Sequence, residues 1–141
     1  MRRYTVLLAD DHTIVTEGLA RLLNEQEFDV VGAVRDGPQL LAAARQLRPD
    51  VIVTDLSMPG LTGLDVLTTL KAEQANSRII LLTMHKDADL ATAAMRGGAS
   101  GYLLKESAGE ELLTAIRQAL QGRVYLTPAL TKDVMERMAR G

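Results

Sequence analysis

Short apolar runs alternate along the chain with segments in which apolar residues recur at helical spacing. Runs rich in Val, Ile and Leu predict five strands, at residues 4–9, 29–34, 51–55, 78–83 and 101–104. The segments between them predict five helices, around residues 14–23, 37–48, 64–70, 88–95 and 107–120. Strands and helices that alternate in this way build βαβ units. We therefore predict an α/β fold, a doubly wound five-stranded parallel sheet of flavodoxin-like order 2-1-3-4-5 that is flanked by five helices.

Three of the expected helix boundaries rest on residues with known backbone preferences. Pro38 suits the first position of a helix, because its missing N–H would be unpaired there in any case. Pro49 ends the same helix, because the residue before a proline avoids the helical region. Ser107 and Glu110 have the spacing of a capping box, which predicts that the last helix begins beside Ser107.

Composition narrows the class of protein. Hydrophobic residues make up 47% of the 141-residue chain but aromatic residues only 3%, so the core must be aliphatic, as in a parallel sheet buried on both faces. The chain has no cysteine, which excludes disulfides and thiolate chemistry. A formal net charge of −2 gives no electrostatic basis for nucleic-acid binding by this chain. No apolar run approaches the roughly 20 residues of a membrane span, so we expect a cytoplasmic protein without a membrane segment.

Polar groups of a particular kind follow the predicted strands. The first strand ends at Asp10 and Asp11, the third at Asp55, the fourth at Thr83 and the fifth at Lys105. In a doubly wound sheet the carboxyl ends of the strands meet at the edge where ligands bind. Clustered carboxylates repel one another unless a cation neutralises them, and oxygen ligands without Cys or His are typical of Mg²⁺. The sequence therefore predicts a Mg²⁺ site at this edge.

Each of these residues also has an ordinary structural explanation. An aspartate after a strand is commonly a turn residue or a helix N-cap. A threonine that closes a strand is usually structural, and a lone lysine is usually a solvated charge. The coincidence of five suitable groups at four strand ends of one sheet is what favours a functional site.

Four ordered motifs carry a resemblance to a known family. LLADDH at residues 7–12, VTDLSMPG at 53–60, LTM at 82–84 and GYLLK at 101–105 resemble the receiver domains of bacterial two-component response regulators. The match extends from about residue 4 to residue 121. ADDH, LTMH and GYLLKE are similar to the NarL/FixJ branch, whose members usually carry a LuxR-type helix-turn-helix after the receiver. The resemblance implies the flavodoxin-like fold already predicted from the alternation of strands and helices.

The resemblance also implies a role for each acidic residue. Asp55 corresponds to the phosphoacceptor. Asp11, Asp55 and the main-chain carbonyl of Ser57 would ligate Mg²⁺ directly, and Asp10 would hold a metal-bound water. Mn²⁺ is a second ion that the same ligands can take. This division fits the chemistry, because an aspartate nucleophile can form an acyl phosphate and phosphoryl transfer needs positioning and charge neutralisation.

Two further residues are implied to bind the phosphoryl group, and one to respond to it. Thr83 would hydrogen-bond a phosphoryl oxygen and Lys105 would pair with another. Thr83 and Tyr102 would form the switch, in which Thr83 moves toward the phosphoryl group and Tyr102 turns inward. Glu106 stands where many receivers have a proline, which leaves the geometry of the preceding peptide bond open.

The implied function is a signalling switch in a transcription regulator. A sensor histidine kinase would phosphorylate Asp55, and the phosphoryl group would switch homodimerisation and output; the chain would not be an enzyme beyond its own phosphorylation and dephosphorylation. We expect residues 1–121 to form the receiver. Residues 122–141, with Leu130, Val134 and Met138 on one stripe, would form a linker or a short helix packed on the receiver. DNA would be bound only through an output domain that is expected to be absent from this chain.

Two other functions compete with this one. A Mg²⁺-dependent phosphatase with an aspartate nucleophile is the alternative, but the haloacid-dehalogenase pattern has a second aspartate where this chain has Ser57. A flavodoxin-like cofactor binder would carry a Ser/Thr/Gly loop after the first strand, where this chain is doubly acidic. His12 and His85 are expected to be loop residues, because neither lies within a long predicted helix.

Overall fold

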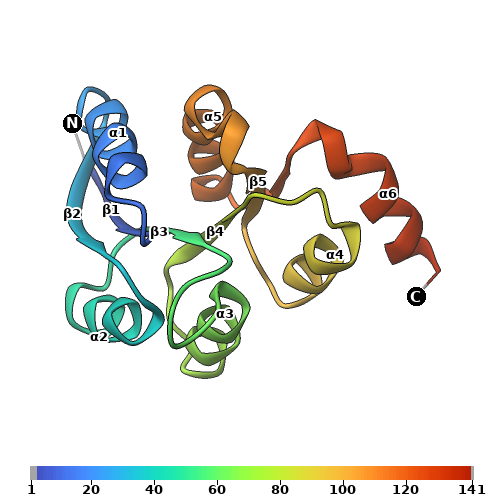
Figure 1. Cartoon of the computed structure of the whole chain (residues 1–141), viewed down its shortest axis with the longest axis horizontal. Helices are drawn as coiled ribbons and strands as arrows, with labels where there is room; N and C mark the ends of the chain where they lie inside the picture. The colour runs from blue at the N-terminus through green and yellow to red at the C-terminus, as the bar shows by residue number, and fades with distance from the viewer. Residues whose placement is uncertain (1–2, 141) are drawn as a thin grey trace.

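The computed structural model describes residues 3–140, and its sheet has the predicted order (Figure 1). Five parallel strands lie in the order β2-β1-β3-β4-β5: β1 (Tyr4–Ala9), β2 (Phe28–Val34), β3 (Val51–Asp55), β4 (Arg78–Thr83) and β5 (Gly101–Leu104). A sixth strand, β6 (Tyr125–Leu126), pairs in parallel with β5 and was not predicted, because two residues are too few to stand out as an apolar run. Residues 1, 2 and 141, the outer ends of the regions predicted as 1–121 and 122–141, lie outside the described residues.

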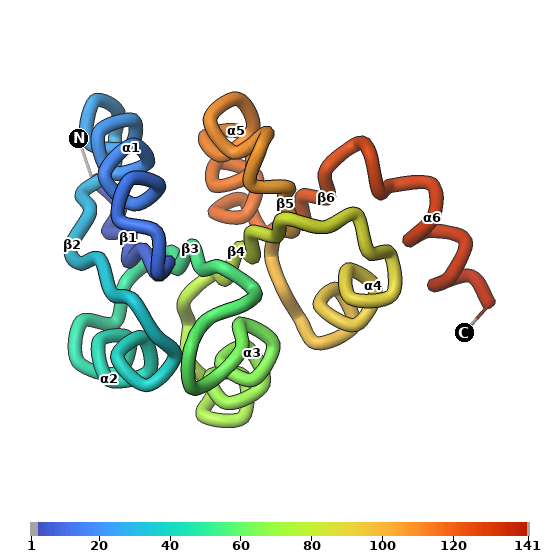
Figure 2. The backbone as a smooth tube through the Cα atoms, in the orientation of Figure 1, coloured from blue at the N-terminus to red at the C-terminus, as the bar shows by residue number. Residues whose placement is uncertain are grey.

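The helices cover the two faces of the sheet in separate groups. The α-helices are α1 (Thr13–Asn24), α2 (Gly37–Leu47), α3 (Gly63–Ala72), α4 (Ala88–Arg96), α5 (Ala108–Leu120) and α6 (Pro128–Ala139). Figure 2 shows α1 and α5 on one face and α2, α3 and α4 on the other, with α6 beside α4. The five predicted helices are therefore confirmed, and the doubly wound arrangement is confirmed with them. Among residues 3–140, no helix combines the length and the apolar surface needed to cross a membrane.

Strand alternation divides the core into two layers. Because successive side chains of a strand point to opposite faces, Leu8 packs with α1 and α5, whereas its neighbour Leu7 packs with α2 and α3. Both side chains are buried, and each contributes roughly 1.5–3 kcal/mol to folding. Continuous apolar strands are therefore what this sheet requires, since both of its faces are covered.

The last helix begins beside Ser107, as predicted, but the capping box expected there is absent. Ser107 makes no side-chain hydrogen bond at the start of α5, so the capping box with Glu110 does not form. The reason is a single 3₁₀ turn, Lys105–Ser107, that runs directly into α5 and gives Ser107 a helical backbone instead of the extended one of an N-cap. A capping box does form at α3, where Thr62 and Asp65 exchange side-chain and main-chain hydrogen bonds.

The segment after Gly122 packs against the sheet edge and α4. Gly122 follows α5 with a φ of 81°, the left-handed conformation expected after a helix end. β6 extends the sheet beside β5, and α6 buries Leu130 and Val134 in the layer that contains α4. Arg137 of α6 also donates from Nε to Asp89 of α4 at 2.7 Å. This segment therefore covers the outer side of α4 and the β5 edge of the sheet.

Candidate functional site

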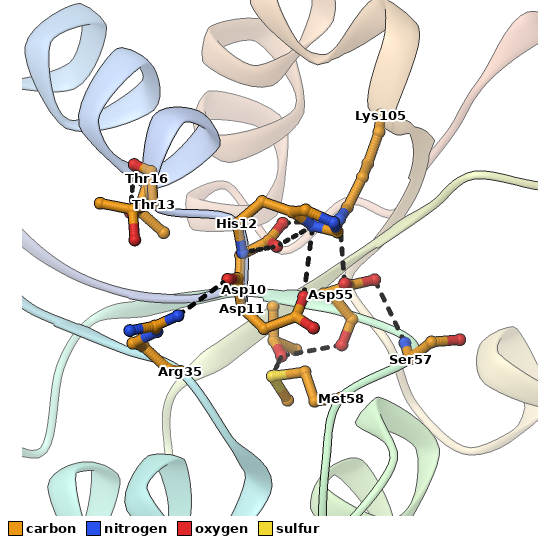
Figure 3. Close-up of polar contacts among 11 residues, drawn as sticks. Asp10, Asp11, His12, Thr13, Thr16, Arg35, Asp55, Ser57, Met58 and Lys105 are labelled. Carbon is orange, nitrogen blue, oxygen red and sulfur yellow. Dashed lines mark hydrogen bonds and ion pairs between the residues drawn. The ribbon is translucent and has the colours of Figure 1, made fainter.

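The carboxyl edge of the sheet brings the predicted charged residues together (Figure 3). Asp10 and Asp11 follow β1, Asp55 closes β3, and Lys105 follows β5. Glycine at position 63 lets α3 start close behind β3, since a Cβ there would lie 2.8 Å from the main-chain oxygen of Asp55. The strand ends and this close approach hold the acidic residues around one point.

Lys105 bridges two of the three carboxylates. Its Nζ lies 2.8 Å from Asp10 Oδ2 and 2.9 Å from Asp55 Oδ2. The side chains of all three residues are buried. Asp10 Oδ2 is paired with Lys105 as an ion pair but accepts no well-aligned hydrogen bond. Removing either charge from such a buried pair would leave the other uncompensated.

Burial and ion pairing act in opposite directions on these groups. Burial alone would raise the pKa of Asp10, but its contacts with Lys105 and His12 outweigh burial and hold that pKa below its ordinary value. Burial alone would lower the pKa of Lys105, but Asp10 and Asp55 outweigh it and raise that pKa. Both groups are therefore charged near neutral pH. Three carboxylates against one ammonium leave an excess of two negative charges, the charge that one divalent cation neutralises.

The oxygen donors fit a hard divalent cation. Ligand atoms from Asp10, Asp11, His12 and Asp55 all lie within 4.8 Å of one another. Asp11 Oδ1 is buried and accepts no well-aligned hydrogen bond, although His12 Nδ1 lies 3.2 Å away, so a bound metal ion would satisfy this oxygen. Carboxylate oxygens at this spacing suit Mg²⁺. The acidic cluster is thus consistent with the metal site typical of receivers.

The other predicted residues lie next to the cluster without joining it. The main-chain N–H of Ser57 donates to Asp55 Oδ1 at 3.1 Å, which holds Ser57 beside the aspartate. Thr83 ends β4 beside β3, but its hydroxyl is occupied in its own turn, where it accepts from the N–H of His85 at 3.2 Å. The Lys105–Glu106 peptide is trans.

Tyr102 already points inward in this structure. Its side chain is fully buried in the layer that contains α4 and α6, and its hydroxyl has no hydrogen-bond partner among residues 3–140. Burial raises the pKa of Tyr102, an effect that nearby Thr83 partly offsets and the charge of Asp87 increases. The structure therefore shows Tyr102 in the inward conformation that was expected only after phosphorylation. An inward movement of this side chain would have to start from a different conformation.

His12 is the residue that the sequence interpretation missed. It does lie in the loop before α1, as expected, but its Nδ1 is 2.9 Å from Asp10 Oδ1 and 3.2 Å from Asp11 Oδ1. The signal was its position directly after the two aspartates. His85 is exposed and its ring contacts no residue of the cluster.

A family model and related proteins identify the class of protein. The model of the response regulator receiver domain matches residues 6–117. The chain belongs to the response regulator receiver family, whose members are phosphoryl-accepting signalling domains. Within that family it is similar to LuxR-type regulators, as its motifs predicted. The match also removes support from the phosphatase alternative.

Individual relatives agree with this assignment. A nitrate/nitrite response regulator protein homolog from Haemophilus influenzae is 38% identical over 133 residues, which are 94% of this chain and 64% of that protein. The crystal structure of a LuxR-family two-component response regulator from Aurantimonas sp. SI85-9A1 is 33% identical, with a TM-score of 0.89 over 97% of this chain and 99% of that one. A structure of two RcsB dimers bound to two parallel DNAs is 28% identical, with a TM-score of 0.86 over 94% of this chain and 68% of that one. The chain thus spans less than two thirds of the curated relative's length.

Proposed function

We propose that Asp55 accepts a phosphoryl group from a phosphohistidine of a sensor kinase, and that this modification controls a transcription regulator. The observation that carries the proposal is the ion pair between Asp55 and Lys105 inside a cluster of three carboxylates. This arrangement supplies a nucleophilic oxygen, a cation for a phosphoryl oxygen, and an excess of negative charge that recruits a divalent ion. Because a histidine kinase is charged from ATP, an intracellular compound, we assign the reaction to the cytoplasm.

The transfer is a displacement at phosphorus. A carboxylate oxygen of Asp55 forms the new O–P bond while the P–N bond to the kinase histidine breaks, and the histidine nitrogen keeps the electron pair and takes up a proton. Lys105 shifts from the carboxylate to a phosphoryl oxygen, which neutralises charge that the transfer brings into the site. The N–H of Ser57 keeps the second oxygen of Asp55 in place. The product is an acyl phosphate.

The same cluster of carboxylates would also bind the divalent ion. Asp11, Asp55 and the carbonyl of Ser57 would hold Mg²⁺ or Mn²⁺ directly, with Asp10 bound through water. When bound, the ion screens the phosphoryl oxygens from the surrounding carboxylates. Asp10 keeps Lys105 at the site in either case, through their 2.8 Å ion pair.

The switch begins at Thr83. To donate its O–H to a phosphoryl oxygen, Thr83 must turn that O–H away from the main-chain oxygen of His85, 3.5 Å from its Oγ1, and this change alters the loop between β4 and α4. A change in this loop reaches Tyr102, whose buried hydroxyl lacks a partner and whose ring packs beneath α6. Phosphorylation would thereby bias the contact between α4 and α6. Phosphorylation can shift the equilibrium between two arrangements of α4 and α6 only if the phosphoryl group makes different contacts in each of them.

The output surface of the phosphorylated protein is the face formed by α1 and α5. The other candidate surface, around α4, β5 and α5, is partly covered by β6 and α6. An apolar groove of about 380 Å³ lies between α1 and α5, and beside it the side chain of Ile14 is 85% exposed. A second copy of this chain is the occupant we assign to it, because a structurally similar regulator binds DNA as dimers. DNA contact would fall to an output domain outside this chain, and residues 122–141 would connect the two.

Phosphorylation can be tested with a small phosphodonor. Acetyl phosphate and Mg²⁺ should add one hydroxylamine-labile phosphoryl group to the chain, and Asp55→Asn should remove it. Asp133→Asn, the same substitution at an exposed aspartate of α6, should leave it in place. Equal labelling of the Asp55→Asn variant would refute the assignment.

A further inference from the structure

A hollow lies at the amino edge of the sheet, at the opposite ends of the strands from the acidic cluster. It is found where β3 and β4 begin and where α2 and α3 end. Its volume of about 760 Å³ is within the range of small-molecule sites, and polar side chains form most of its wall. The hollow is thus large enough for a ligand, and its chemistry is set by charged groups.

Two arginines of this wall have no partner. The guanidinium groups of Arg48 and Arg78 make no hydrogen bond or ion pair with any residue between 3 and 140. A third arginine of the wall, Arg45, is paired with Glu73, to which its Nε and Nη2 donate at 3.0 and 2.5 Å. The other carboxylate of the wall, that of Asp50, accepts hydrogen bonds from β1. The two remaining guanidinium groups therefore present positive charge that no carboxylate contacts.

Hydrogen bonds fix the backbone that carries these two arginines. The buried hydroxyl of Ser77 donates to the main-chain oxygen of Pro49 at 2.6 Å, and the main-chain N–H of Arg78 donates to that of Asp50 at 2.9 Å. The segments around Arg48 and Arg78 thus lie side by side, and neither guanidinium group is needed to hold them. A ligand between the two side chains would meet a frame that is already ordered, which lowers the entropic cost of binding.

Two residues of the wall also have a strained backbone. Arg48, after α2, has a φ of 46° and Gln74, after α3, a φ of 59°; between residues 3 and 140 no other residue except glycine has a positive φ. Glycine or asparagine usually fills the left-handed position after a helix, because other side chains meet a steric cost there. Here two long polar side chains occupy it, and both line the hollow. Strain of this kind is concentrated at binding sites.

These observations together define the chemistry of a ligand. A guanidinium group binds phosphate or carboxylate oxygens through pairs of N–H donors. We infer that the hollow binds a small anion with at least two charged oxygens, a phosphate or a carboxylate compound, between Arg48 and Arg78. The inference is independent of the proposed function, because Asp55 and Lys105 lie at the other edge of the sheet. The competing explanation is that the two arginines only offset the partial negative charges at the ends of α2 and α3.

Calorimetric titration of metal-free protein with sodium pyrophosphate and, separately, with citrate decides between these explanations. At least one of the two anions should bind, and Arg48→Gln and Arg78→Gln should each raise its dissociation constant at least about 5-fold, since each removes charge-assisted hydrogen bonds. Arg21→Gln removes the same charge from an exposed position on α1 outside the hollow, and should bind like the wild type. Tighter binding of pyrophosphate would identify a phosphate ligand, and tighter binding of citrate a carboxylate ligand.

Three results of this titration would overturn the inference. They are no binding of either anion by the wild type, unchanged affinity in Arg48→Gln and Arg78→Gln, and an equal loss of affinity in Arg21→Gln, which would indicate attraction to the overall charge alone.

The place of binding is tested on the unaltered protein. In ¹⁵N-labelled wild type, the anion that binds should shift the amide resonances of Arg48 and Arg78 and leave those of Asp11 and Asp55 unmoved. Shifts at Asp11 and Asp55 without shifts at the two arginines would place the anion beside Lys105, and would also overturn the inference.

Discussion

Asp11→Asn should make the protein more stable when no divalent ion is present. The ligand atoms of the three aspartates lie within 4.8 Å of one another. Two unit charges at this distance repel by about 1 kcal/mol in water and by about 3.5 kcal/mol at an effective dielectric constant of about 20. The carboxylate of Asp11 is repelled by the carboxylates of Asp10 and Asp55 and attracted by the ammonium group of Lys105. The net effect is repulsion from one negative charge. Its side chain is 39% exposed, which favours the lower value, and we expect a gain of about 1 kcal/mol.

Mg²⁺ should reverse this order. An ion that binds only the folded state at ten times its dissociation constant stabilises that state by about 1.4 kcal/mol. The wild type should gain this amount, whereas Asp11→Asn should gain little, because it has lost a charged ligand. Urea unfolding at neutral pH, followed by circular dichroism with EDTA or with Mg²⁺, measures both free energies of unfolding.

The matched control for this comparison is Asp133→Asn. Asp133 is exposed on α6, away from the sheet edge, so the substitution should leave both free energies within about 0.5 kcal/mol of the wild type. If Asp11→Asn instead destabilises the metal-free protein, or keeps the full stabilisation by Mg²⁺, then Asp11 is an ordinary turn residue.

Three further predictions concern the glycine behind the site, the switch and the output surface. Gly63→Ala should lower stability by about 1–3 kcal/mol and slow phosphorylation, because its Cβ would meet main-chain atoms of β3; Gly18→Ala, with open space around it, should gain about 0.5–1 kcal/mol in urea unfolding. Thr83→Ala should still be phosphorylated, but hydrogen exchange of β5 should respond less; an undiminished response would refute the coupling. Ile14→Asp should abolish phosphorylation-dependent dimers in light scattering, whereas Met135→Asp, at a 61% exposed position on α6, should not; dimers that persist in Ile14→Asp would exclude the α1–α5 surface.

Most of the fold could be predicted because the central strands β3, β4 and β5 are buried on both faces. A strand such as Val51–Asp55, a β-branched run that ends at an aspartate, has clear ends, and four of the five predicted strands match the structure residue for residue. β2 begins one residue earlier than predicted, at Phe28, which packs against Tyr4 of β1. β6 is only two residues long, and what orders it is its pairing with β5, a tertiary contact that local sequence does not reveal.

In the site, too, the features that depend on strand ends could be predicted, whereas those that depend on tertiary contacts could not. Asp10, Asp11, Asp55 and Lys105 were predicted to converge because parallel strands share a carboxyl edge, and the structure brings them together. The inward orientation of His12 depends on a side-chain rotamer and on the unneutralised carboxylates around it, neither of which periodicity describes. The burial of Tyr102 depends on β6 and α6, whose docking on the receiver was left open by the sequence.

Chemical trapping at single-residue resolution tests the central claim most directly. Borohydride reduces an aspartyl phosphate to homoserine, so the phosphorylated aspartate can be identified in a peptide by tandem mass spectrometry. After incubation with acetyl phosphate and Mg²⁺, we predict homoserine at position 55 and unmodified aspartate at positions 10 and 11. Homoserine at position 10 or 11, or at none of the three, would contradict the assignment of Asp55 as the phosphoacceptor.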